Sequence, residues 1–165
     1  MNKGDNKVFR EMRRQKQAIS REECITLLKS ETRGVLAMRG DDDYPYCVPI
    51  NHYYCEEDGK IYFHGGMAGH RVDAVKKHDK VCYSLYDEGY IKEGDWALHV
   101  KSVVIFGRIK IVEDHDRAIE LCRQLSYKFT NDENYINEEI RKCAKATLVM
   151  ELEIEHMTGK LVSEK

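Results

Sequence analysis

Residues 59–85 read GKIYFHGGMAGHRVDAVKKHDKVCYSL, and we expect the rest of the chain to be arranged around this stretch. Its apolar start at 61–63 is typical of a β-strand, and residues 70–78 form a helix-competent run with Val72 and Val75 on one side. Three glycines fall within positions 65–69, where no Cβ keeps a ligand away from the backbone N–H groups. The stretch therefore predicts a strand, a glycine-rich loop and a helix, in that order.

The residues that follow the glycines suggest what the loop could bind. Unpaired N–H groups and the positive end of the helix dipole face the loop, and His70 and Arg71 add donors or charge at the same end. These features favour an anion, most simply a phosphate. A plain strand–turn–helix connection, in which the glycines only make the turn, explains the same residues equally well.

Composition excludes several classes of protein. The 165 residues predict one domain, and with 34% charged residues and a net charge of -2 there is no broad electrostatic support for nucleic-acid binding. No run of eighteen apolar residues predicts a membrane span, and the polar, basic N-terminus does not read as a secretory signal. The six cysteines form no C-x-x-C pair, which argues against a zinc or redox-dithiol site, so we expect no metal and reduced thiols in a cytoplasmic protein.

The segments around the glycine-rich stretch predict a mainly β protein. Short turns between neighbouring strands indicate an antiparallel sheet, and about six such strands can close into a small barrel. The expected strands are 32–38, 44–54, 60–64, 80–86, 96–112 and 146–154. The expected helices are 20–30, which begins with a capping box at Ser20 and Glu23, about 70–78, one from 113, and about 132–144. Residues 87–95 read as a loop and 156–160 as a turn.

Three positions within these elements carry further expectations. Pro49 cannot donate to a sheet ladder, so its strand must be an edge there or must leave the sheet, and Gly107 offers a bend or bulge in the longest strand. A break at 48–51 would leave backbone polar groups free for the rim of a planar heteroaromatic ring, although a bulged edge strand is equally consistent. Lys101 and Ser102 lie at the polar start of the longest strand, where a ligand contact or simple half-exposure would both fit.

Two segments receive structural interpretations. The helical stripes at 118–129 and 135–143 are typical of core packing rather than of a cofactor box. Residues 1–18, with Arg10, Arg13 and Arg14, read as an arm that is either solvated or folded over a partner subunit or an anionic ligand. The domain proper is therefore expected at 19–165.

Several segments, taken together and in order, resemble the FMN-binding split-barrel superfamily. Within it the chain is similar to pyridoxamine-phosphate-oxidase-like proteins of the nitroimidazole-resistance type, from about residue 12 to residue 160. The segments are MRRQ (12–15), RGVLAM (33–38), YPYCVPINHYY (44–54), GKIYFHGGMAGHR (59–71), KSVVIFGRIKIVED (101–114) and ELEIEHMTGK (151–160). The resemblance implies a mainly β fold, a six-stranded antiparallel split β-barrel with flanking helices, and a homodimer with one FMN in each of two clefts between subunits.

The resemblance also assigns cofactor contacts, residue by residue. Val48, Pro49, Ile50 and Asn51 would run along the isoalloxazine ring, and Phe63, His64 and Gly65 would lie between ring and phosphate. His70 and Arg71 would meet the phosphate, and Lys101 and Ser102 would come from the other subunit. The sequence departs from the family at 15–17, which read Gln-Lys-Gln instead of Lys-Asp-Arg, and at Gly69 and His70, where relatives often keep a Ser or second basic residue. The substrate-binding arginine and histidine of true pyridoxamine-phosphate oxidases have no match at 156–165, so vitamin B6 oxidation is not expected.

The function implied is an FMN-dependent oxidoreductase that passes electrons from NAD(P)H to a small substrate, a nitroaromatic such as a nitroimidazole or a quinone. His64 would be the catalytic proton donor, or else would make a structural hydrogen bond to the ribityl chain or phosphate. The alternative is a non-catalytic flavin binder, or a haem binder in which one of His52, His64, His70 and His99 is a ligand.

Overall fold

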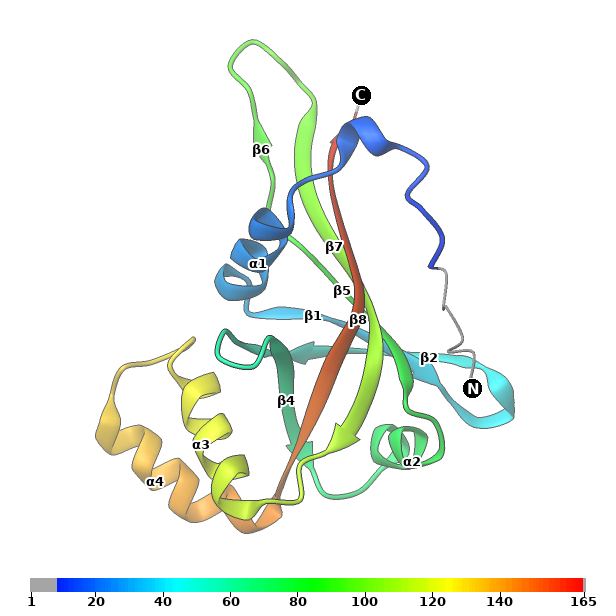
Figure 1. Ribbon diagram of the computed structural model, residues 1–165. Helices are drawn as coiled ribbons and strands as arrows, with labels where there is room; N and C mark the ends of the chain where they lie inside the picture. Colours follow the sequence, from blue (N-terminus) through cyan, green and yellow to red (C-terminus); the bar gives the residue numbers. More distant parts are fainter. Residues whose placement is uncertain (1–8, 165) are drawn as a thin grey trace.

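The structure is a computed structural model in which residues 9–164 are described, Glu164 by its backbone alone. Figure 1 shows a strongly curved sheet with helices at its ends and side. The strands are β1 Arg33–Arg39, β2 Pro45–Asn51, β3 Tyr53–Cys55, β4 Lys60–Gly66, β5 Lys80–Tyr86, β6 Tyr90–Ile91, β7 Leu98–Ile111 and β8 Thr147–Glu164. The α-helices are α1 Arg21–Ser30, α2 His70–Lys77, α3 His115–Ser126 and α4 Glu133–Cys143. None of the helices in residues 9–164 is long and apolar enough to cross a membrane.

The order of the strands makes the sheet a split barrel. All pairings are antiparallel, the order is β2-β1-β5-β7-β8-β4-β3, and β6 pairs with β7. β2 and β3 form opposite ends of this path, yet only His52 separates them in the chain. Two peptide units span about 7 Å at most, so the two edges of the sheet must approach each other at this point. The predicted mainly β, antiparallel split barrel with flanking helices is confirmed.

His52 shows why the predicted strand 44–54 is two strands. Its ring is fully buried, with Nε2 2.8 Å from the backbone oxygen of Leu28 and Nδ1 2.8 Å from the hydroxyl of Tyr83. The chain leaves the edge of the sheet to place this ring inside. Both alternatives for Pro49 therefore hold, because β2 is an edge strand and the chain leaves the sheet directly after it.

Two other strand predictions need correction. The expected count of six is wrong, because the described residues form eight strands, including the two-residue β6 within the predicted loop 87–95. The turn predicted at 156–160 is also wrong, since β8 continues through it as the partner of β7. Gly159 is buried there, and a β-carbon at this position would overlap Cys24 and Ile19, so this glycine permits close packing of the segment leading into α1.

Other local predictions are confirmed. Ser20 and Glu23 form the reciprocal capping box at the start of α1, with both hydrogen bonds at 3.1 Å. The ladder between β7 and β8 shifts register between Phe106 and Gly107, which is the predicted irregularity. A bulge lets a long strand bend, as β7 must if it is to follow the barrel wall.

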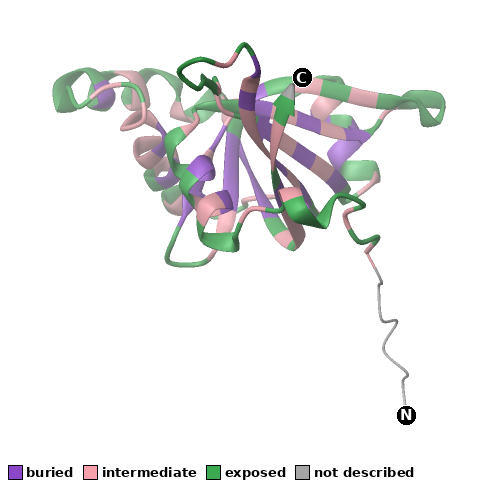
Figure 2. Cartoon of the chain, turned by 90° about the horizontal axis from the view of Figure 1, so that it is seen from above, coloured by how far each residue is buried: buried purple, intermediate pink, exposed green. Residues whose placement is uncertain are grey.

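The core fills the inside of the curved sheet, and buried residues line its strands in Figure 2. Leu36, Phe63, Tyr83 and Ile105 are fully buried there, and Leu28 of α1 packs onto them. A smaller cluster of Cys55, Tyr62, Leu121 and Val149 joins α3 to the outside of β3, β4 and β8. α3 therefore covers the outer side of β3, β4 and β8, and α4 packs against α3.

A second outer surface of the sheet carries small and apolar residues that are exposed or half-buried. We call it the sheet face; it consists of outward residues of β1, β2, β5 and β7, in two rows that cross the strands in register. The rows are Pro49, Val35, Ser84 and Val104, and Cys47, Ala37, Cys82 and Phe106. Phe9, in the described part of the predicted arm, stacks on Phe106 and His156 at its border, whereas residues 1–8 of that arm lie outside the described residues.

Candidate functional site

The strand, loop and helix predicted at 59–85 are present. β4 ends in His64, Gly65 and Gly66, and α2 begins at His70 with Gly69 as its N-cap. Gly69 has φ 115°, a backbone conformation that residues with a side chain rarely adopt. No side chain of the described residues makes a capping hydrogen bond at the start of α2. The N–H groups of the first turn of α2 therefore remain without a capping side chain beside the end of β4.

Arg71 lies against this end of β4. A β-carbon at Gly65 would overlap Nη2 of Arg71, so the guanidinium occupies space that only a glycine leaves open. Nε of Arg71 is buried and has no hydrogen-bond partner among residues 9–164. A buried donor without an acceptor costs about 1–3 kcal/mol, and a bound anion would supply that acceptor. The residues present thus fit a phosphate group at this position.

His70 points elsewhere. Its ring stacks on Tyr46 with centroids 4.0 Å apart, and Nε2 is 3.7 Å from a carboxylate oxygen of Asp41. This places the side chain over the connection between β1 and β2, away from Gly65. The structure therefore does not bring His70 and Arg71 together, and a phosphate contact by His70 would need a different rotamer.

His64 lies between Arg71 and a pocket. Its side chain is exposed, but the protein around it displaces enough water to lower the pKa of the imidazole, and the positive charge of Arg71 lowers this pKa further. The ring is therefore neutral at pH 7, so one nitrogen donates a hydrogen bond and the other accepts one. A neutral imidazole at this point can accept a proton, and it can donate one hydrogen bond from its N–H group.

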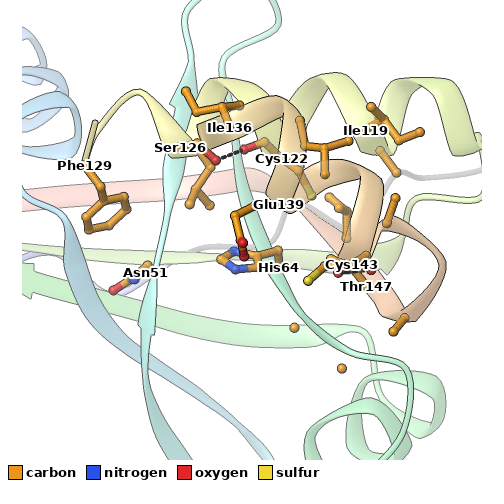
Figure 3. A pocket seen from close by; sticks show the side chains of 18 of the residues that line it. Asn51, His64, Ile119, Cys122, Ser126, Phe129, Ile136, Glu139, Cys143 and Thr147 are labelled. Carbon is orange, nitrogen blue, oxygen red and sulfur yellow. Dashed lines mark hydrogen bonds between the residues drawn. The ribbon is translucent and has the colours of Figure 1, made fainter. Parts of the chain in front are cut away.

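The pocket, which we call the α3–α4 pocket, has a volume of about 610 Å³ and lies between the ends of β2 and β4, the start of β8, and the two helices α3 and α4. Figure 3 shows His64 and Asn51 on the sheet side and the helical side chains opposite them. The lining residues of α3 and α4 and the loop between them are His115, Ala118, Ile119, Cys122, Leu125, Ser126, Phe129, Thr130, Tyr135, Ile136, Glu139, Ile140 and Cys143. Most of this wall is apolar.

The predicted ring-contact residues lie around the split of the barrel. In β2, Ile50 is buried and Val48 packs against the core, whereas Pro49 is exposed on the other side of the strand. Asn51 lines the α3–α4 pocket, and its side-chain oxygen accepts a hydrogen bond of 2.9 Å from Nε of Arg33. Phe63 is fully buried, so only its backbone is available to a ligand.

Lys101 and Ser102 lie in the other half of β7. Lys101 forms an ion pair of 2.9 Å with Glu23. Ser102 is opposite Lys160 in the ladder between β7 and β8. The ladder puts Ile111 opposite Met150, whose neighbour Val149 is opposite His64. Ser102 and Ile111 are nine residue steps apart along the strand, or about 30 Å. One chain therefore does not bring Lys101 and Ser102 to His64 and Arg71.

The residues that sequence reasoning missed are those of α3 and α4. Their apolar stripes predicted core, and Leu121, Leu125 and Ile136 are indeed buried. Phe129 and Tyr135, however, remain 52% and 56% exposed while lining the pocket. A signal was available in the sequence, because two consecutive amphipathic helices offer more apolar surface than one sheet edge can cover.

Comparison with known proteins identifies a family and several solved structures with the same fold. The family model described as pyridoxamine 5'-phosphate oxidase matches residues 20–161. No curated protein matches the sequence. The fold is similar to that of a proposed 5-nitroimidazole antibiotic resistance protein from Bacteroides thetaiotaomicron, with a TM-score of 0.74, 16% identity, and 88% and 87% of the two chains covered.

Two further solved structures share the fold. A FAD-binding protein from Mesorhizobium loti has a TM-score of 0.64 and 21% identity over 89% of this chain and 98% of its own. A FAD- and haem-binding protein from Mycobacterium smegmatis has a TM-score of 0.70 and 22% identity over 91% of this chain and 74% of its own. At these identities the likeness shows the fold.

Proposed function

Because the chain belongs to the pyridoxamine 5'-phosphate oxidase family, we propose that it binds FMN, with the phosphate at Arg71 and the start of α2. The observation that carries this proposal is the buried Nε of Arg71, which has no partner among the described residues and lies beside the glycine end of β4. A phosphate there would accept charge-assisted hydrogen bonds from the guanidinium and from backbone N–H groups.

The flavin ring would lie along β2 and the end of β4. β2 pairs only with β1 in the described sheet, so the backbone groups on its other side are free of any ladder. These groups at 48–51 suit the polar rim of an isoalloxazine ring, as the family resemblance implies. His64 and Gly65 would lie between the ring and the phosphate.

A second copy of the chain would complete the site. Lys101 and Ser102 are assigned to the flavin by resemblance, but they lie about 30 Å along β7 from the residues beside His64. The sheet face offers exposed apolar side chains, among them Phe106 and Pro49, to a partner. We therefore infer a homodimer in which Lys101 and Ser102 of the partner subunit reach each flavin.

The proposed reaction is the transfer of electrons from NAD(P)H to a small nitroaromatic or quinone. FMN supplies the redox chemistry when bound, and the protein binds and orients it. To act as proton donor, His64 would first have to take up a second proton as imidazolium; partial burial and Arg71 lower its pKa and disfavour that form, whereas a phosphate bound at Arg71 would offset the positive charge. A structural hydrogen bond from His64 to the ribityl chain or phosphate is the competing role.

The experiment has two stages. The cofactor is released from the purified protein and identified by its mass and absorption spectrum, which separates FMN from FAD and haem. The loaded protein is then mixed with NADPH or NADH without oxygen, and a nitroaromatic is added. Bleaching by the nicotinamide and reoxidation by the nitro compound support an oxidoreductase; a flavin that neither donor reduces favours passive binding. A protein that takes up no flavin refutes the proposal.

A further inference from the structure

We propose that the α3–α4 pocket is a substrate pocket for uncharged planar ring compounds, and that Glu139 makes it reject anions. This inference rests on the proposed function, because it takes the flavin to lie at the ends of β2 and β4. Asn51, His64 and Gly65 belong both to the proposed flavin site and to the lining of this pocket. A molecule in the pocket would therefore meet the flavin at the side where His64 stands.

The walls of the pocket suit an apolar molecule. Ile119, Ile136, Ile140 and Val149 line it, together with Leu125. Its volume of about 610 Å³ lies within the range of about 300–1,000 Å³ typical of small-molecule sites. Burial of apolar ligand surface against these side chains is favourable without any specific hydrogen bond.

Two hydroxyl groups that line the pocket, one on α3 and one at the start of β8, already donate to backbone oxygens. Ser126 Oγ donates to the backbone oxygen of Cys122 at 2.8 Å, and Thr147 Oγ1 donates to that of Cys143 at 2.9 Å. The polar groups of the lining that lie nearest the proposed flavin are on the sheet side, at His64 and the side-chain amide nitrogen of Asn51. A ligand with one polar end and an apolar body would bind with the polar end toward the flavin.

Two aromatic side chains favour planar ligands. Phe129 lines the pocket from the turn after α3 and Tyr135 lines it from α4, and both keep about half of their surface exposed. Exposed aromatic rings in a pocket gain free energy by stacking on another ring. The pocket therefore favours a flat ring over a flexible chain of the same size.

Charge gives the pocket its selectivity. Among the described residues that line it there is no lysine or arginine, the side chains that normally hold a phosphate or carboxylate. Glu139 adds a negative charge, and its ion pair with Lys142 is a long one of 3.6 Å. In Figure 3 the Glu139 side chain extends from α4 toward His64. An anionic substrate, including a phosphorylated one, would meet the repulsion of Glu139 and no lysine or arginine among the described residues of the pocket wall, because Arg71 lies behind His64 and is assigned to the flavin phosphate.

The test uses the flavin-loaded protein, NADPH, and two nitroaromatics that differ in charge, methyl 4-nitrobenzoate and 4-nitrobenzoate. We expect kcat/KM to be at least tenfold higher for the neutral ester. Glu139→Lys should raise the ratio of kcat/KM for the acid to kcat/KM for the ester at least tenfold, and Glu139→Gln should raise this ratio less. Asn134→Lys adds a positive charge to the same helix outside the pocket, and it should leave the acid-to-ester ratio of kcat/KM within twofold of wild type.

A filling variant tests the location. Ile140→Trp should raise KM for the ester at least fivefold while the Kd for FMN stays within twofold. If Glu139→Lys and Ile140→Trp leave kcat/KM and KM unchanged for both substrates, the inference is wrong while the proposed function stands. Calorimetric titration of methyl 4-nitrobenzoate into flavin-free Arg71→Ala gives the separate readout: ester binding that Ile140→Trp weakens supports the pocket even if flavin never binds, and its absence refutes it.

Discussion

The guanidinium of Arg71 occupies the space where a β-carbon of residue 65 would stand, which is possible because residue 65 is a glycine. The two residues come from different elements, the start of α2 and the end of β4. The overlapping atom, Nη2, is at the free end of a flexible side chain, so a methyl group at 65 would displace Arg71 without moving the backbone. Gly65 therefore fixes the position of Arg71 rather than the fold.

Gly65→Ala should weaken FMN binding and leave stability nearly unchanged. Loss of a hydrogen bond to a charged group costs about 1.5–3 kcal/mol, or about 10- to 150-fold in Kd, if Arg71 is fully displaced. Fluorescence titration with FMN measures the affinity. Gly66→Ala is the matched control, because a β-carbon there meets no atom within 4 Å.

The same substitution in an Arg71→Ala background isolates the coupling. If Gly65 acts through Arg71, adding Gly65→Ala to Arg71→Ala should weaken FMN binding little further. Additive losses in this double-mutant cycle would show that residue 65 touches the ligand directly and would remove the role assigned to its missing side chain.

The pKa of His64 should report on Arg71. Partial burial and then the charge of Arg71 lower this pKa in the single chain. Arg71→Ala removes the repulsion between two positive groups, so the pKa of His64 should rise toward its ordinary value, whereas Arg71→Lys should move it less. NMR titration of the imidazole in flavin-free protein measures both, and an identical pKa in all three proteins would contradict the geometry.

His52 should make the protein acid-sensitive. Burial, with a smaller effect of Lys128, lowers its pKa to about 4. Between pH 6.5 and 4 the unfolded chain binds a proton that the folded protein does not, so the stability supplied by neutral His52 is full above pH 6.5 and is lost as the pH falls toward 4. From pH 7 to 4.5 this loss is about 2 kcal/mol.

Urea unfolding at pH 7 and 4.5 checks this value against His52→Gln, whose amide is able to donate to Leu28 but does not titrate. Carboxylate titration affects both proteins alike, so the difference in their pH dependence belongs to His52. Equal pH dependence in the two proteins would show that folding does not lower the pKa of His52.

The sheet face should hold two copies together. Val104→Asp puts a charge among its apolar residues, and we expect a wild-type dimer and a monomeric variant by light scattering, with FMN affinity reduced because Lys101 and Ser102 of the partner subunit are lost. Asn131→Asp, in the exposed loop before α4, is the control and should remain dimeric. A monomeric wild-type protein that binds FMN tightly would contradict the shared site.

Local signals in the sequence were enough for the features that neighbouring residues determine. The capping box at Ser20, the irregularity at Gly107 and the strand–glycine–helix order all follow from spacing within one segment. Pro49 correctly indicated an edge because a missing donor has the same consequence in any sheet.

Features determined by distant residues were not predictable in this way. Gly159 resembles a turn signal but is required by Cys24, and the break at His52 depends on Leu28 and Tyr83, 24 and 31 positions away. The periodicity of α3 and α4 shows that one face is apolar, yet it does not tell whether that face meets protein or an open pocket. Leu121 meets the sheet, and Phe129 meets the pocket.

The measurement that tests the central claim most directly compares FMN with riboflavin, which lacks the phosphate, in wild type and Arg71→Ala. We expect wild type to bind FMN at least tenfold more tightly than riboflavin, and Arg71→Ala to lose most of this preference while its riboflavin affinity stays close to that of wild type. Equal affinities for the two flavins in wild type, or a preference for FMN that survives Arg71→Ala, would contradict the claim that Arg71 beside Gly65 holds the phosphate.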